Sequence, residues 1–72
     1  MKKTIYSDEH RRLVDRLKKA RIAVGLDQPE TARLLGKTQS YISKIESGQR
    51  RIDMVQLKEF ARLYKKKLAF FI

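Results

Sequence analysis

The residues best suited to chemistry lie close together between positions 39 and 46. Their side chains are hydrogen-bonding and either short or flexible: Gln39, Ser40, Ser43 and Lys44. If this segment is a helix with Ile42 and Ile45 facing the core, these four lie on or near the opposite, solvated face. Such side chains suit the base edges of a DNA major groove, where Gln pairs with adenine and Lys reaches guanine. Polarity alone is more typical of an ordinary solvated surface, so charge and the neighbouring elements decide between the two interpretations.

The overall charge favours a polyanionic partner. Eighteen Lys and Arg oppose eight Asp and Glu in 72 residues, which gives a net charge of +10 and a pI near 10.3. A surplus of this size draws a protein to nucleic acid or to an anionic membrane surface. The sequence has no apolar run near the roughly 18–20 residues that span a bilayer, and residues 1–10 lack the apolar stretch of a signal peptide. We therefore expect a cytoplasmic, nucleoid-associated protein that does not bind membranes.

Catalytic chemistry is not indicated. Ser40 and Ser43 have no nearby base to activate them, and His10 falls in the opening turn of another helix, where we expect it to be solvated. The chain has no cysteine and a single histidine, so we expect no metal, cofactor or disulfide. Seventy-two residues form one small domain with little room for a catalytic cleft. We predict a protein that is not an enzyme.

Two short helices joined by a tight turn are predicted between Gln28 and Glu46. Their start and stop signals are an acidic capping box of Asp27 with Glu30, Pro29 in the first turn, Gly36 as a left-handed stop and Thr38 as the cap of the second helix. The small Ala32 lets the two helices cross at close range. We therefore assign structural roles to Ala32, Gly36, Ile42 and Ile45.

A longer helix precedes this pair, from Asp8 to Val24, with Ser7 as its cap and Gly25 as its stop. Its apolar stripe consists of Leu13, Leu17, Ala20 and Val24, with Val14 beside it. Arg21 projects from the same buried side, where a charge needs a partner. Glu46, one turn beyond Ile42 on the inward face of its helix, is the natural partner. We interpret Arg21 and Glu46 as a structural ion pair.

Residues suited to phosphate contact flank the second short helix. Gln28 and Thr38 stand at the amino ends of the two helices, where the helix dipole favours anions. Gln49, Arg50 and Arg51 follow in the next loop. Phosphate contacts at these places would fix the register of a protein on DNA without reading its sequence.

The C-terminal part is expected to close the core. Asp53 and Gln56 form a capping box for a fourth helix, on which Leu57, Phe60, Ala61 and Tyr64 recur at helical spacing. The last five residues, LAFFI, leave three alternatives: a short fifth helix packed on the core, a dimer contact, or continuation into a longer protein. We expect residues 1–7 to form a basic arm and residues 8–72 to form the domain.

Residues 26–48, LDQPETARLLGKTQSYISKIESG, resemble the helix-turn-helix of the lambda-repressor-like (XRE) family of bacterial and phage DNA-binding regulators. Many positions coincide with the family pattern at fixed spacing. The chain departs from it at Thr31, where Leu is usual, at Lys37, where an apolar residue is common, and at Tyr41, where a small residue is common. We expect Thr31 and Lys37 to weaken the local core slightly and the Tyr41 ring to compensate by packing there.

The resemblance implies a compact all-α domain of four to five helices, in which helices 2 and 3 form the helix-turn-helix. It implies a sequence-specific double-stranded DNA-binding regulator of repressor type, with a recognition helix at about residues 38–47. The partner would be a pseudopalindromic operator bound by a homodimer. The roles of phage-type repressor, restriction-modification controller and antitoxin all remain open.

Two other functional classes also fit the sequence. A nonspecific nucleic-acid binder would depend on charge without base readout, and random duplex would then compete as well as any selected site. A protein-interaction adaptor would keep the fold without the DNA contacts, and Lys44→Glu would then leave partner binding intact.

Overall fold

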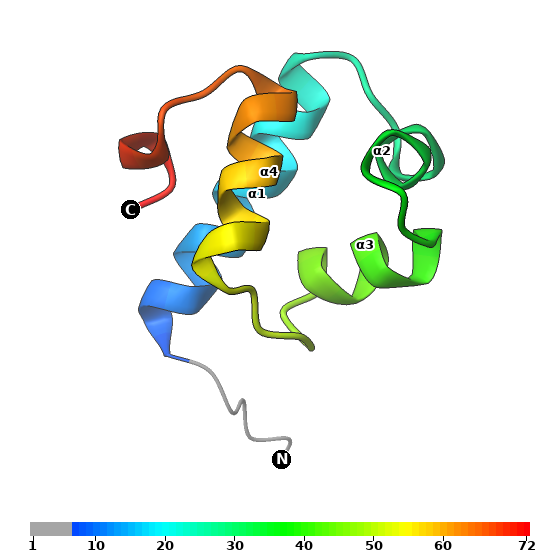
Figure 1. Ribbon diagram of the computed structural model, residues 1–72. Coiled ribbons are helices and arrows are strands. Elements are labelled where there is room, and N and C mark those ends of the chain that lie inside the picture. The colour runs from blue at the N-terminus through cyan, green and yellow to red at the C-terminus, as the bar shows by residue number, and fades with distance from the viewer. Residues whose placement is uncertain (1–6) are drawn as a thin grey trace.

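The first helix begins at the cap that the sequence predicts. In the computed structural model, which describes residues 7–72, α1 spans Asp8–Ala23 (Figure 1). The Ser7 hydroxyl accepts a hydrogen bond of 3.2 Å from the His10 backbone N–H. Two acidic residues in the first turn lie at the positive end of the helix dipole. The predicted basic arm lies, apart from Ser7, outside the described residues.

The next two helices have the predicted caps. Helix α2 spans Gln28–Leu35, and its acidic capping box is complete because each partner's side chain accepts from the other's backbone N–H. Gly36 ends α2 with φ +69, a left-handed conformation that costs glycine little. Helix α3 spans Gln39–Glu46, and the Thr38 hydroxyl accepts from the Tyr41 N–H at 3.1 Å. The predicted helix of residues 38–47 is thus α3 together with its two capping residues.

The C-terminal elements close the domain. Helix α4 spans Met54–Tyr64 and begins with the predicted capping box of Asp53 and Gln56. Its C-terminal cap is Lys65, which has the left-handed φ of +59. A short 3-10 helix, η1, spans Leu68–Phe70. The regular elements of residues 7–72 are therefore all helical, as predicted, and none of these helices is long and apolar enough to cross a membrane.

One hydrophobic core joins all five elements. Helices α2 and α3 lie to one side of α1 and α4, and η1 lies on the other side (Figure 1). The core contains Leu17, Ala20, Ala32, Tyr41, Ile42, Ile45, Leu57, Phe60, Ala61, Tyr64 and Phe71. The predicted burial of Ala32, Ile42 and Ile45 is confirmed. The prediction for Val24 is wrong: this residue is exposed because α1 ends at Ala23 and Val24 serves as its cap.

The LAFFI tail packs on the core as a short helix, the first of the three predicted alternatives, but its helix is only the three-residue 3-10 helix η1. The Phe71 side chain is only 2% exposed and packs into the core, edge to face with Phe70. The Arg16 guanidinium, from α1, donates a hydrogen bond of 2.9 Å to the Phe70 carbonyl. Ile72 remains exposed. The tail therefore helps to hold α1 and α4 together.

Thr31, a departure from the family pattern, is fully buried on α2. Its hydroxyl donates a hydrogen bond of 2.8 Å to the Asp27 carbonyl, so the polar group is satisfied inside the core. The neighbouring Tyr64 ring is also buried, and burial raises the pKa of its phenol to about 12. The threonine is accommodated here by a local backbone acceptor.

Candidate nucleic-acid interface

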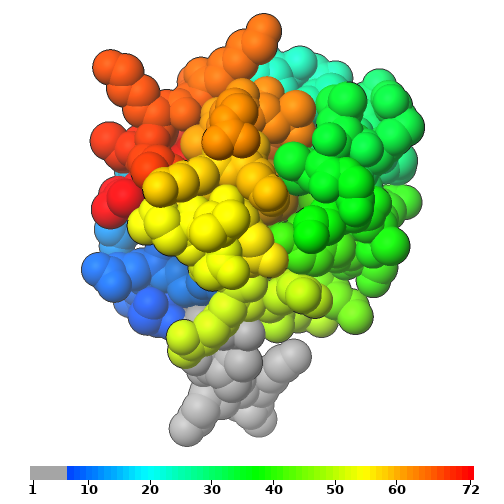
Figure 2. All heavy atoms as spheres, viewed as in Figure 1, coloured from blue at the N-terminus to red at the C-terminus, as the bar shows by residue number. Residues whose placement is uncertain are grey.

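The outward face of α3 carries the four predicted base-contacting residues. Gln39, Ser40, Ser43 and Lys44 are all exposed. On the opposite face, Ile42 and Ile45 are 0% and 1% exposed, so packing against α1 and α2 fixes which side of α3 faces solvent. Atoms of α2 and α3 reach the molecular surface on one side of the view in Figure 2 (green). This face is available to a partner.

A buried ion pair fixes the end of α3 against α1. Arg21 Nε lies 2.7 Å from Glu46 Oε2 and Arg21 Nη2 lies 3.1 Å from Glu46 Oε1, a two-pronged contact between side chains that are 10% and 5% exposed. The remaining Arg21 Nη1 donates to the Leu26 carbonyl at 2.8 Å. The hydrogen bond to Glu46 raises the pKa of Arg21 against the opposing effect of burial. The predicted structural pairing of Arg21 with Glu46 is confirmed.

Gln28 joins the same network. Its side-chain Nε2 donates to Glu46 Oε1 at 3.1 Å, so Glu46 accepts hydrogen bonds from both α1 and α2. Gln28 is half-buried at the first position of α2. The sequence predicts a phosphate contact for Gln28 but not this bond, because a contact between residues 28 and 46 depends on how the two helices cross.

The other residues predicted to contact phosphate surround α3. Thr38 is exposed at its amino end, with its hydroxyl engaged as the helix cap. Gln49, Arg50 and Arg51 are exposed in the loop that follows. The loop is tied to α3 by a hydrogen bond of 2.9 Å from the Gln49 backbone N–H to the Lys44 carbonyl. The structure therefore brings the predicted polar and basic groups together at one helix and its two ends.

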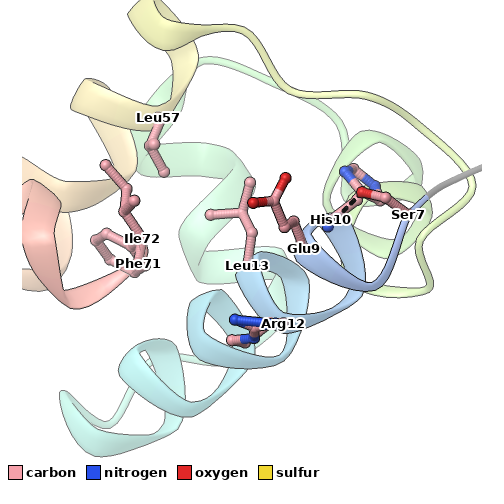
Figure 3. Close-up of a pocket in the computed structure, with 8 residues that line it drawn as sticks. All are labelled: Ser7, Glu9, His10, Arg12, Leu13, Leu57, Phe71 and Ile72. Carbon is pink, nitrogen blue, oxygen red and sulfur yellow. Dashed lines mark hydrogen bonds between the residues drawn. The ribbon is translucent and has the colours of Figure 1, made fainter.

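A cavity of about 330 Å³ lies elsewhere, between the start of α1, Leu57 of α4 and the C-terminal Phe71 and Ile72 (Figure 3). His10 lines it and is partly buried, so the expectation of a solvated histidine is wrong. Burial lowers the pKa of His10, and the positive charge of Arg51 adds to the effect. The nearby Ser7 hydroxyl is used as the helix cap and accepts from the His10 backbone N–H (Figure 3).

Comparison with known proteins decides the family. The sequence matches the helix-turn-helix family model over residues 17–71. The chain belongs to the lambda-repressor-like (XRE) helix-turn-helix family. Its fold is similar to the crystal structure of the restriction-modification controller protein C.AhdI from Aeromonas hydrophila, with a TM-score of 0.81 and 27% identity, over 92% of this chain and 100% of that one. No curated protein matches the chain in a sequence comparison.

Lys37 and Tyr41, two of the positions at which this XRE-family chain departs from the family pattern, are in contact. The Lys37 Nζ lies 5.3 Å from the centroid of the Tyr41 ring, and the Arg50 Cζ lies 4.9 Å from the same centroid. Both distances are typical of cation–π contacts. Burial raises the pKa of the Tyr41 phenol, while the nearby Arg50 opposes this rise. The sequence marks Lys37 and Tyr41 as separate departures from the pattern but predicts neither their contact nor the position of Arg50 over the same ring.

Proposed function

We propose that this helix-turn-helix regulator binds double-stranded DNA sequence-specifically, with α3 in the major groove. The observation that carries the proposal is the division of α3 into two faces. Its apolar side is fixed in the core by Ile42 and Ile45, while its hydrogen-bonding side is exposed along the helix. An α-helix fits the width of the major groove, and helix-turn-helix proteins place their second helix there.

Gln39, Ser40, Ser43 and Lys44 are the proposed readers of base edges. Gln39 is the first residue of α3 and is exposed, a placement that suits the N-terminal part of a recognition helix. The Gln amide can pair bidentately with adenine, the Lys ammonium can donate to guanine, and the two hydroxyls can donate or accept. Together they supply donors and acceptors for discrimination among base pairs.

The proposed phosphate contacts are Gln28, Thr38, Gln49, Arg50 and Arg51. Gln28 keeps a second N–H on the amide that donates to Glu46, and this group can donate to a phosphate oxygen. The two arginines carry a permanent charge and a fork of donors that matches phosphate. These groups would set the position of α3 on the duplex, and base contacts would then set the sequence.

The proposed assembly is a homodimer on a pseudopalindromic operator. One α3 of eight residues reads only a few base pairs, and a two-fold pair of such helices doubles the length of the site. The likeness to C.AhdI, a restriction-modification controller protein, favours that role among the three open to this chain. Repression of a promoter that contains the operator is the activity we expect.

Selection of bound duplexes from a random pool tests this function. We expect enrichment of an inverted repeat with half-sites about one helical turn apart, since each protomer would place one α3 in the groove. Enrichment of a single, non-repeated half-site would support base readout by α3 but contradict the proposed homodimer. A pool that stays random after several rounds, while the protein still binds DNA, would contradict sequence-specific readout and support a nonspecific binder.

A further inference from the structure

The ring of Tyr41 lies between two segments that flank α3. Lys37 comes just before the Thr38 cap, and Arg50 lies in the loop after the helix, yet both cationic groups lie over this one ring. Tyr41 is itself on the first turn of α3 and only 9% exposed. A ring held in the core thus contacts a cation from each end of the helix.

The ring is fixed in the core, whereas the two cations belong to exposed residues. Tyr41 belongs to the buried cluster that includes Ile42 and Ile45, so its rotamer is set by packing. Lys37 and Arg50 are exposed residues with long side chains, which lose conformational freedom when they bind a partner. Attraction to the negative face of the ring restricts them before binding and reduces that entropic loss.

We propose that Tyr41 is a positioning residue for DNA binding, whose buried ring holds Lys37 and Arg50 at the two ends of α3 where both meet phosphates. The inference rests on the proposed function and adds Lys37 to the phosphate contacts. Tyr41 itself need not touch the DNA. A chain with a small residue at this position would lack the ring, so the arrangement depends on the chain's own departures from the family pattern.

Affinity for the selected duplex, measured over a range of salt concentrations, tests the role of the ring. Tyr41→Leu keeps an apolar side chain and removes the π face, and we expect it to weaken binding about 3- to 10-fold. The dependence of affinity on salt should keep its slope, because the same phosphates are neutralised in the complex. Tyr41→Phe keeps the ring and should bind within about twofold of the parent protein.

The effect of Tyr41→Leu in the parent protein and its effect in a variant without the two cations together separate positioning from a merely structural role. In the Lys37→Gln, Arg50→Gln double variant the cations are absent, so adding Tyr41→Leu should cause no further loss of affinity. Phe60→Leu is the matched control, since it also replaces a buried ring of the core but lies over neither cation. It should lower stability and leave the affinity of the folded protein unchanged. An undiminished loss from Tyr41→Leu in the double variant would overturn the proposal.

A measurement on the parent protein keeps the test open if Tyr41→Leu fails to fold. The Tyr41 ring current should shift the NMR signals of the Arg50 δ-methylene and the Lys37 ε-methylene upfield, both in the free protein and in the DNA complex. Absence of these shifts would contradict the proposal. If Arg50→Gln weakens binding and Tyr41→Leu does not, the positioning role fails while the proposed function stands; if the selected duplex is not preferred at all, both fail.

Discussion

The guanidinium of Arg21 and the carboxylate of Glu46 connect the last turn of α1 to the end of α3 through a contact of 2.7 Å. Glu46 is the last residue of α3, and its side chain also accepts from Gln28 of α2. One carboxylate therefore fixes three helices relative to one another. The orientation of the exposed face of α3 depends on this arrangement, because the contacts on the buried face fix how the helix is rotated.

Removal of either partner of this pair should destabilise the domain strongly. Glu46→Gln or Arg21→Met alone leaves a buried charge without its partner, which costs about 3–5 kcal/mol. The double replacement Arg21→Met, Glu46→Met removes both charges and should recover much of that loss. Urea unfolding gives the three free energies. Single-variant losses below about 1 kcal/mol would indicate that the pair behaves like an exposed one.

Stability should fall as the medium becomes acidic, because of His10. Its pKa in the folded state lies below the ordinary value of 6.5, so the unfolded chain takes up a proton first as the pH decreases. The contribution of neutral His10 to the free energy of unfolding is fully present above about pH 6.5. It is lost progressively as the pH falls from there toward the folded-state pKa. Urea midpoints from about pH 8 to about pH 5.5 measure this slope. His10→Gln should flatten it, and since the chain has one histidine, equal slopes in both proteins would assign the effect to other groups.

Gln39→Ala should change which base is preferred at one position of the operator. Loss of a bidentate contact costs about 1–3 kcal/mol on the best sequence and little on sequences that never made it. Binding to the selected duplex and to its three single-base variants at each position supplies the comparison. A uniform loss across all of them would assign Gln39 to positioning.

Arg50→Ala should weaken binding to every duplex by a similar factor. One fewer phosphate is neutralised, so the slope of log affinity against log salt should become shallower by about one unit. Lys67→Ala is the matched control, because it removes the same charge beside η1, across the molecule from α3 (Figure 1). The control should keep the parent slope; a change of equal size in both variants would mean that net charge alone governs binding.

The helices and their caps were predictable from local signals. Asp27 with Glu30, Gly36, Thr38, and Asp53 with Gln56 each act on backbone groups within four residues, and all take their predicted places. The pairing of Arg21 with Glu46 is a longer-range success. It was predictable because a charge on an apolar helix face requires a partner, and Glu46 lies one turn beyond Ile42 on the inward face of its helix.

Contacts set by the crossing of elements were not predictable in the same way. The bond from Gln28 to Glu46 and the convergence of Lys37 and Arg50 on Tyr41 join segments whose separation in space depends on the whole fold. The lowering of the His10 pKa has in part the same origin, since the positive charge that adds to the effect of burial belongs to Arg51 in the loop after α3. Local periodicity carries no information about these distances.

Site-directed cross-linking tests the placement of α3 most directly. The chain has no cysteine, so Ser40→Cys places a unique thiol on the exposed face of α3, and Ala69→Cys, in η1, is the control on the other side of the molecule. The selected operator carries a thiol tethered to a base either in the major groove or in the minor groove. We predict a disulfide between Ser40→Cys and the major-groove tether alone. A minor-groove disulfide, or cross-linking through Ala69→Cys with none through Ser40→Cys, would contradict the account.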